Sequence, residues 1–287
     1  MERIILIETS TALCSVALAE DGAIVGYRES SAPKAHASLT AVFIQEMLSE
    51  RGLGIGDCDA ICVSMGPGSY TGLRVGVSTA KGLCFGAKVP LIAVGTLDTL
   101  VAQAAGIPGQ AGNDGQAGDD GQGLDANDGQ GIDANDGQDG DDEGEGYDGS
   151  VIAGLTGNLK YIVPMIDARR MEVYTAVWKQ DTTDENVPAP TAGFRQVTET
   201  TPMIIDENSF ADILADGPVL FIGDGAGKCA GVIKHPNAHF CQCHPKASSM
   251  LFPALAAYKE KRFEDVAYFE PFYLKEFVAT VSKKKLF

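Results

Sequence analysis

The chain has 287 residues, 45% of them hydrophobic, and its 39 acidic against 22 basic residues leave a formal charge of −17 at pH 7. Thirteen of the acidic residues lie in 106–150, which has no Lys or Arg, so the rest of the chain has a net charge of only −4. This length and balance suit one large or two modest globular domains, and they exclude a protein that binds nucleic acid tightly through a basic stripe of its own.

The N-terminus and the cysteines predict a cytoplasmic protein. The first three residues lead directly into an apolar run without the pattern of a signal peptide, and no apolar stretch is long enough to span a bilayer. The seven cysteines are an odd number, and Cys14, Cys62 and Cys84 lie within apolar runs. We therefore expect buried free thiols, as in the reducing cytosol, and no contact with a membrane.

The first 105 residues predict an alternation of strands and helices. Strands are expected over 4–8, 14–19, 23–27, 60–64 and 91–94, and helices over 35–50, 71–88 and 96–105. Asp21-Gly22 is a typical hairpin turn between the second and third strands. The order is therefore β-β-β-α-β-α-β-α.

A glycine-rich loop, Gly66-Pro67-Gly68-Ser69, joins the fourth strand to the second helix. Either Ser69 or Thr71 is expected to cap that helix. Backbone N–H groups at such a helix start can bind an anion or a carbonyl. A tight turn that only lets helix and strand pack closely fits the same residues, so the loop by itself leaves both interpretations open.

The helix after this loop carries small residues at every fourth position: Gly72, Gly76, Ala80 and Cys84. Helical glycine costs about 1 kcal/mol relative to alanine, which is acceptable where something must approach the backbone closely. The approaching element is either the sheet of the same chain or a helix of another chain. We predict the second alternative, with Val75 and Phe85 facing inward instead.

Residues 106–150 interrupt the pattern with Gly, Asp, Asn and Gln and few apolar side chains. An eight-residue unit starting at Leu124 is nearly repeated from Ile132. This composition predicts a disordered, dispensable insert. Calcium binding is the more specific alternative, but Asp125, Asn127 and Gly129 miss the EF-hand spacing by one residue.

The second half repeats the organisation of the first. Strands are expected over 161–166, 172–178, 194–198 and 219–222, and helices over 209–215, 226–234 and 247–262. A second glycine loop, Gly223-Asp224-Gly225, again follows the fourth strand. Two β-β-β-α-β-α units indicate an internal duplication, which is the architecture of the actin, Hsp70 and sugar-kinase superfold, a two-lobed α/β fold with ribonuclease H-like halves. We expect lobes at 1–105 and 151–265, and a C-terminal segment, 266–287, that returns to the first lobe.

Several ordered motifs resemble the TsaB family, a subgroup of the glycoprotease-like M22 proteins. They are IILIETSTALCSVAL near the N-terminus, GPGSYTGLRVG at the first glycine loop, VPMIDARRMEVY from Val163, and EPFYL from Glu270. The family usually has Asp where this chain has Glu8. Asp167, Arg169 and Arg170 match its Asp-Ala-Arg-Arg motif and are expected either to face the cleft or to form a salt-bridged hairpin.

The resemblance implies a scaffold subunit without catalytic residues. It would pair with the catalytic subunit TsaD and the ATPase TsaE to form N6-threonylcarbamoyladenosine at position 37 of tRNAs that read ANN codons, contacting tRNA only through that complex and forming a homodimer when alone. We expect two helices, 35–50 and 71–88, to pair with the same helices of the partner. The predicted interface residues are His36, Leu39, Phe43, Met47, Gly72, Leu73, Gly76, Val77 and Ala80.

The residue types give little indication of a catalytic or metal site. TsaD presents a His-x-x-x-His pair, whereas His36 is followed four residues later by Thr40, so we predict no metal. Cys241-Gln242-Cys243-His244 leaves a structural zinc as the alternative. No cofactor is expected to be required, although the loops that would surround a phosphate in this superfold could bind ATP or ADP weakly. These residues are Ser10, Thr11, Gly66, Pro67, Gly68, Ser69, Gly223, Asp224 and Gly225. The rival functions are an M22-type metallopeptidase and an ATP-dependent small-molecule kinase.

Overall fold

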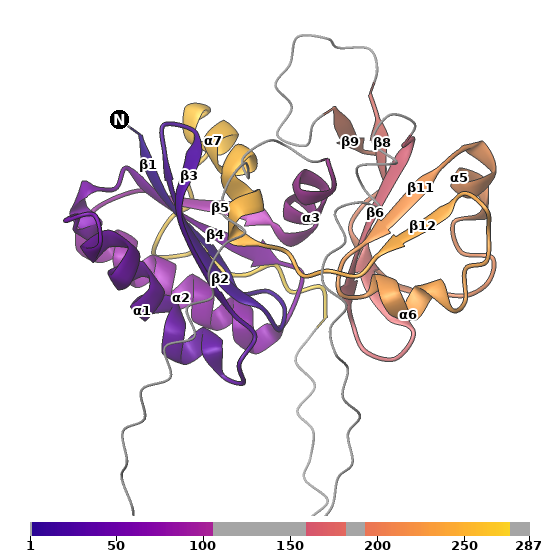
Figure 1. Ribbon diagram of the computed structural model, residues 1–287, viewed down its shortest axis with the longest axis horizontal. Coiled ribbons are helices and arrows are strands. Elements are labelled where there is room, and N and C mark those ends of the chain that lie inside the picture. The colour runs from indigo at the N-terminus through magenta and orange to yellow at the C-terminus, as the bar shows by residue number, and fades with distance from the viewer. Residues whose placement is uncertain (1, 106–158, 182–192, 276–287) are drawn as a thin grey trace, which may run out of the picture.

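Two β-sheets flanked by helices make up the computed structural model, which describes residues 2–105, 159–181 and 193–275 (Figure 1). The predictions about the 106–150 insert, including the calcium alternative, concern residues outside these ranges. None of the described helices is long and apolar enough to cross a lipid bilayer.

The first half folds in the predicted order, with small shifts at the ends of the elements. The elements are β1 (Arg3–Glu8), β2 (Cys14–Glu20), β3 (Ala23–Ser30), α1 (Ala35–Ser49), η1 (Ile55–Asp57), β4 (Ala60–Gly66), α2 (Tyr70–Ala87), β5 (Leu91–Gly95) and α3 (Thr96–Ala104). The sheet order is β3-β2-β1-β4-β5, in which the first three strands are antiparallel and β1, β4 and β5 are parallel.

The second half repeats this order. Its elements are β6 (Tyr161–Asp167), β7 (Glu172–Thr175), β8 (Trp178–Gln180), β9 (Phe194–Gln196), β10 (Thr201–Ile204), α5 (Ala211–Asp216), β11 (Val219–Ile222), α6 (Ala226–Ala230), β12 (Ala238–Cys241), η2 (Ala247–Met250) and α7 (Leu251–Lys259). The path β10-β7-β6-β11-β12 matches β3-β2-β1-β4-β5 strand for strand in both order and direction. The predicted duplication and two-lobed α/β fold are therefore confirmed.

Several details of the second half differ from the prediction. The expected strand over 172–178 is two strands, because β7 pairs with the end of β6 and β8 pairs with its start. Between them lies Pro164, which has no N–H for the ladder, and the hydroxyl of Thr175 donates to its carbonyl at 2.8 Å instead. Two four-residue strands, β10 and β12, were not predicted, because they are short and acquire strand structure by pairing with a neighbour.

Each sheet is covered on one face by a helix from the other half of the chain. Leu97, Leu100 and Val101 of α3 join the core of the second sheet. Conversely, Met250, Leu251 and other residues of η2 and α7 pack on the first sheet, against Ile4, Leu6 and Ile92. This exchange joins the lobes, and it means that the predicted lobe ranges describe the order along the chain but not the packing.

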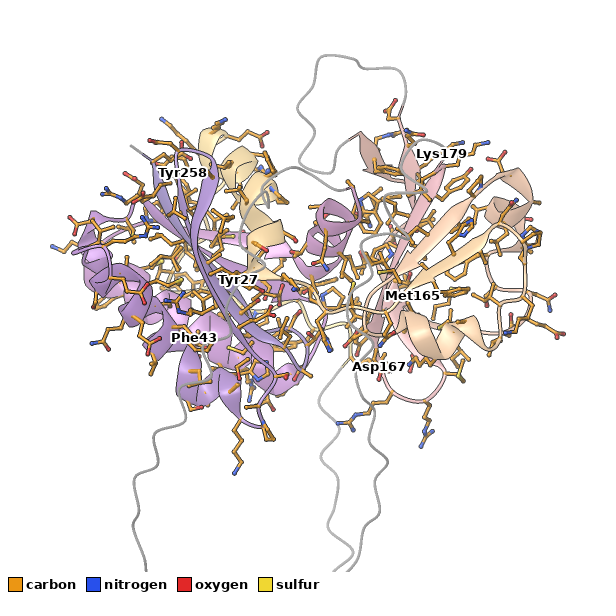
Figure 2. The ribbon with its side chains drawn as sticks, viewed as in Figure 1. Tyr27, Phe43, Met165, Asp167, Lys179 and Tyr258 are labelled. Carbon is orange, nitrogen blue, oxygen red and sulfur yellow. The ribbon has the colours of Figure 1, made fainter. Side chains whose placement is uncertain are left out.

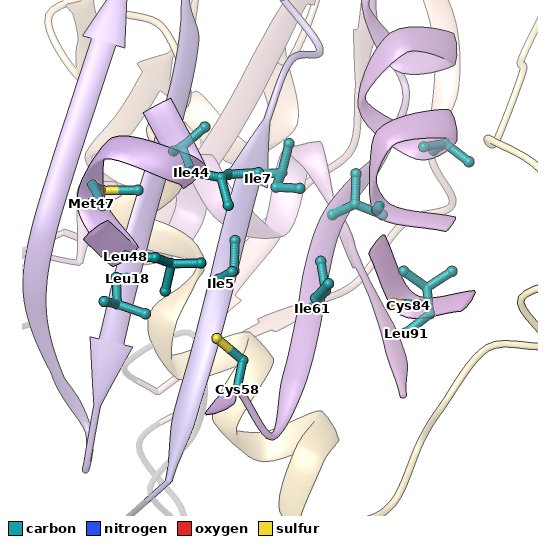
Figure 3. Packing of buried hydrophobic residues seen from close by; sticks show 14 of the residues in the cluster. Ile5, Ile7, Leu18, Ile44, Met47, Leu48, Cys58, Ile61, Cys84 and Leu91 are labelled. Carbon is teal, nitrogen blue, oxygen red and sulfur yellow. The ribbon is translucent and has the colours of Figure 1, made fainter. Parts of the chain in front are cut away.

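The opposite face of the first sheet carries α1 and α2 (Figure 3). Ile44, Met47 and Leu48 of α1 pack against Ile5, Ile7 and Leu18 of the sheet, and Cys84 of α2 packs near Leu91. The pair lies at the outer, lower side of the first lobe in Figure 1. This position leaves one side of each helix free of the sheet.

Candidate functional site

The outer side of α1 and α2 is one candidate site, and the structure corrects which residues it presents. Gly72 and Gly76 face Thr9, which directly follows the chain's own first strand: a Cβ atom added to Gly72 would lie 2.1 Å from the carbonyl oxygen of Thr9, and one added to Gly76 would lie 2.2 Å from the Thr9 hydroxyl. The ribbon of small residues thus lets α2 approach β1, so the predicted orientation of this helix was wrong.

Most of the predicted interface residues are consequently buried within the chain. The buried ones are Met47, Gly72, Leu73, Gly76, Val77 and Ala80, whereas His36, Leu39 and Phe43 are half-buried. Phe85, expected to face inward, is 81% exposed, and Val42 of α1 is 40% exposed. The physical reason is that the glycine positions, which have no side chain, allow the closest approach, so they take the side next to the sheet. Val42 of α1 and Phe85 of α2 are therefore the large apolar side chains that these two helices expose, whereas Phe43 packs against the core of the first lobe.

The first glycine loop is closed against the β1–β2 turn. The Ser69 N–H donates to the Ser10 carbonyl at 2.6 Å, and a Cβ atom on Gly68 would lie 2.3 Å from that same oxygen. The Ser69 hydroxyl caps α2 by accepting from the Gly72 N–H at 3.3 Å. Of the two predicted capping residues, Ser69 is therefore the one that caps the helix, and Thr71 is not. Of the two interpretations left open for this loop, close packing of helix and strand accounts for its glycines.

The second glycine loop packs in the same way on β6. Gly223 has a φ of +129°, and a Cβ atom there would lie 2.2 Å from the Met165 carbonyl oxygen. The Gly225 N–H donates to the same carbonyl at 3.0 Å. Asp224 accepts from the Asp167 N–H at 2.9 Å, and burial raises the pKa of its carboxyl to about 6. The Gly223 N–H also donates to the Cys241 carbonyl of β12 at 3.1 Å, so this loop packs on β6 and β12, whereas the first loop packs on Ser10. The two predicted phosphate loops therefore lie at the ends of different strands.

A buried carboxyl at the end of β1 was not among the predicted site residues. Glu8 is completely buried, and its Oε1 accepts from the Ser10 N–H at 2.7 Å. Its Oε2 has no hydrogen-bond partner within the described part of the chain, and neither do the buried hydroxyls of Thr9, Ser10 and Thr96. Desolvation raises the pKa of Glu8 to about 7. The signal in the sequence was a glutamate at the end of an otherwise apolar strand.

Thr11 connects the two halves of the chain. Its carbonyl accepts from Nε2 of His36 at 2.8 Å, so this nitrogen carries the proton of the ring. Its hydroxyl lies 3.1 Å from Nδ1 of His244, which follows β12. Burial lowers the pKa of His244. His36 therefore orients the turn after β1 and the start of α1, as a polar structural residue.

The zinc alternative for Cys241, Cys243 and His244 is not supported by the geometry. Both thiols lie in the core of the second lobe, where Gln103 Nε2 donates to Cys243 Sγ at 3.5 Å. His244 points to Thr11 instead. Across residues 2–105, 159–181 and 193–275, no group of three His, Cys, Asp or Glu side chains is arranged to hold a metal ion.

The C-terminal segment docks on the start of α2, on the first lobe. The Phe272 N–H donates to the Met65 carbonyl at 2.7 Å, and the rings of Tyr273 and Tyr70 lie 4.7 Å apart. Lys81 of α2 donates to the carbonyls of Ala267 and Phe269 at 3.1 and 3.0 Å. A groove of about 240 Å³ remains between this segment and α2. The segment thus fixes α2 from the side away from α1.

Comparisons with known proteins give relatives for the N-terminal part of the chain. A family model of TsaD, tRNA N6-adenosine threonylcarbamoyltransferase, matches residues 26–112. The tRNA threonylcarbamoyladenosine biosynthesis protein TsaB of Escherichia coli is 41% identical over 103 residues, and that of Haemophilus influenzae is 42% identical over 102. Each match covers 36% of this chain and 44% or 42% of the relative, so the chain spans less than half the length of the curated relatives it matches.

Solved structures match over almost the whole chain. YeaZ from Pseudomonas aeruginosa superposes with a TM-score of 0.66 at 20% identity, covering 96% of this chain and all of that one. A second structure from the same organism, described as similar to the peptidase YEAZ, gives a TM-score of 0.67 at 21% identity. At these identities the likeness shows the fold, while the sequence matches confirm the resemblance to TsaB that the motifs indicated.

Proposed function

We propose that this chain is a TsaB-type subunit, without catalytic residues of its own, of the assembly that forms N6-threonylcarbamoyladenosine in tRNA. The observation that carries the proposal is the 41% identity to TsaB over 103 residues, together with the TsaD family model, which matches residues 26–112 and so includes both helices of the candidate interface. The matched relatives are named for tRNA modification, which favours this role over a metallopeptidase or a small-molecule kinase.

The partner in this proposal is a TsaD-type transferase that binds the outer face of α1 and α2. Support comes from the exposed apolar side chains there, since a soluble chain gains nothing by itself from Phe85 at 81% exposure. When alone, the chain would pair through the same face with a second copy. TsaE and tRNA would join through the transferase, in the cytoplasm.

No cofactor is required in this role. The Ser69 and Gly225 N–H groups, which would otherwise be available to a phosphate, already donate to carbonyls of the chain. We therefore expect ATP or ADP to bind weakly if at all, because binding must first break these contacts.

Phe85→Asp is expected to weaken binding of the TsaD-type partner by about 30-fold or more, as for a central apolar interface residue worth about 2 kcal/mol. The variant should fold normally, because the side chain lies in solvent. Titration calorimetry with the purified partner, followed by a reconstituted threonylcarbamoylation assay with and without this chain, measures both effects.

The matched control is Ile204→Asp on β10, which is 73% exposed but lies on the second lobe. It should bind and function like the wild type. Wild-type chain that neither binds the partner nor raises tRNA modification would refute the proposed function. If Phe85→Asp binds the partner normally, the proposed function would stand, but the interface would lie on another part of the surface.

A further inference from the structure

The turn between β6 and β7 presents two arginines in a conformation that costs energy. Arg169 and Arg170 have φ angles of +72° and +52°, the left-handed region that favours glycine and asparagine. The turn is closed by the Ala168 N–H, which donates to the Glu172 carbonyl at 3.1 Å, and by Asp167 Oδ1, which accepts from the Arg169 N–H at 2.7 Å. The Glu172 N–H also donates to the Arg169 carbonyl at 3.2 Å, so the loop holds two successive residues at positive φ, where Asn or Gly is accommodated more easily than arginine.

The acidic side chains beside the turn already have basic partners. Asp167 pairs with Lys228, and Glu172 pairs with Lys275. Arg169 and Arg170 are both exposed, and no salt bridge among the described residues includes either of them. The expected salt bridge between Asp167 and the two arginines is therefore absent from the described residues, and the tip of the turn carries two positive charges outside these ion pairs.

The tip of this turn and the α1–α2 pair lie toward the same side of the molecule in the view of Figure 1. In Figure 1 the turn after β6 is at the lower edge of the second lobe, beneath α6, and the α1–α2 pair is at the lower edge of the first lobe. Figure 2 labels Asp167, at the base of the turn, at the lower side of the second lobe, and Phe43 on α1 of the first lobe. A partner seated on the helix pair would thus face the same side of the molecule as the arginines.

We propose that Arg169 and Arg170 bind the phosphate backbone of tRNA in the assembled complex. Guanidinium groups match phosphate oxygens with two parallel hydrogen bonds, and such contacts position an RNA without reading its sequence. Two charges are too few for the chain to bind tRNA by itself, and the chain outside residues 106–150 has a net charge of −4. The inference rests on the proposed function, to which it adds a direct contact between this subunit and the substrate.

The test replaces the two arginines by the residues that the turn geometry favours, Arg169→Asn with Arg170→Gly. This double variant should be at least as stable as the wild type, because the strain in the turn is relieved. In the reconstituted complex its affinity for tRNA should fall, and the slope of log affinity against log salt should become shallower by about one to two, or roughly 0.7 to 0.9 for each lost phosphate contact.

The charge-matched control is Lys234→Ala with Lys259→Ala, which removes two exposed cations elsewhere. It should leave the salt slope unchanged. An unchanged slope for Arg169→Asn with Arg170→Gly, in a complex that assembles and modifies tRNA, would refute the inference alone. Weaker partner binding with an unchanged slope would also refute it, because the arginines would then contact an acidic protein surface. A wild-type chain that fails to join an active complex would refute the proposed function instead.

Discussion

Gly72→Ala is expected to destabilise the chain by about 3 kcal/mol or more, at the upper end of the cost of overpacking. The added Cβ atom would lie 2.1 Å from the carbonyl oxygen of Thr9, a fully buried residue that directly follows the central strand β1 of the first sheet. Either α2 or β1 must shift, and with it the core between them. Urea denaturation followed by circular dichroism measures the change in the free energy of unfolding.

Gly82→Ala is the matched control on the same helix. No atom lies within 4 Å of a Cβ added there, so this substitution should stabilise the chain by up to about 1 kcal/mol through helix propensity alone. Gly76→Ala should fall between the two, because the Thr9 hydroxyl that it meets belongs to a side chain that can change rotamer. A Gly72→Ala variant that is as stable as the wild type but cannot bind the partner would show that the small residues of α2 belong to the partner interface.

Glu8→Gln is expected to make the chain more stable than the wild type above pH 7, by roughly 3 kcal/mol. Burial raises the pKa of the folded-state carboxyl from its ordinary value of 4.5 to about 7. Between these values the folded chain holds a proton that the unfolded chain has released, so the stability of the wild type falls as pH rises from about 4.5 to about 7. Glutamine is neutral at every pH, so the Glu8→Gln variant does not lose stability in this way as the pH rises.

The two proteins should therefore be nearly equal in stability at pH 4 and diverge by pH 8, as thermal or urea unfolding at several pH values would show. Glu46→Gln, on the exposed side of α1, is the control and should not change the pH dependence. Taking the difference between variant and wild type removes the contributions of the other buried acids, such as Asp98 and Asp224. A constant difference from pH 4 to 8 would show that Glu8 is charged when folded.

The amino-acid sequence by itself determined the elements, their order and the duplication. Short continuous apolar runs predicted β1, β4 and β11, and four-residue spacing predicted α1 and α2 to within a residue or two of their ends. These signals are local, because each strand or helix must bury one face whatever lies against it. The motifs around Gly66 and Asp167 likewise sufficed to indicate the resemblance, since motifs in fixed order do not depend on knowing the packing.

Only the tertiary structure decided which surfaces meet. A stripe of small residues is equally typical of a helix against its own sheet and of a helix against a partner, and the carbonyl of Thr9 beside Gly72 settles that choice. The exchange of α3 and α7 between the sheets, the two strands opposite Pro164, and the burial of Glu8 are likewise products of long-range packing. A sequence pattern specifies that a face is buried, but the partner of that face depends on chain segments that are distant in the sequence.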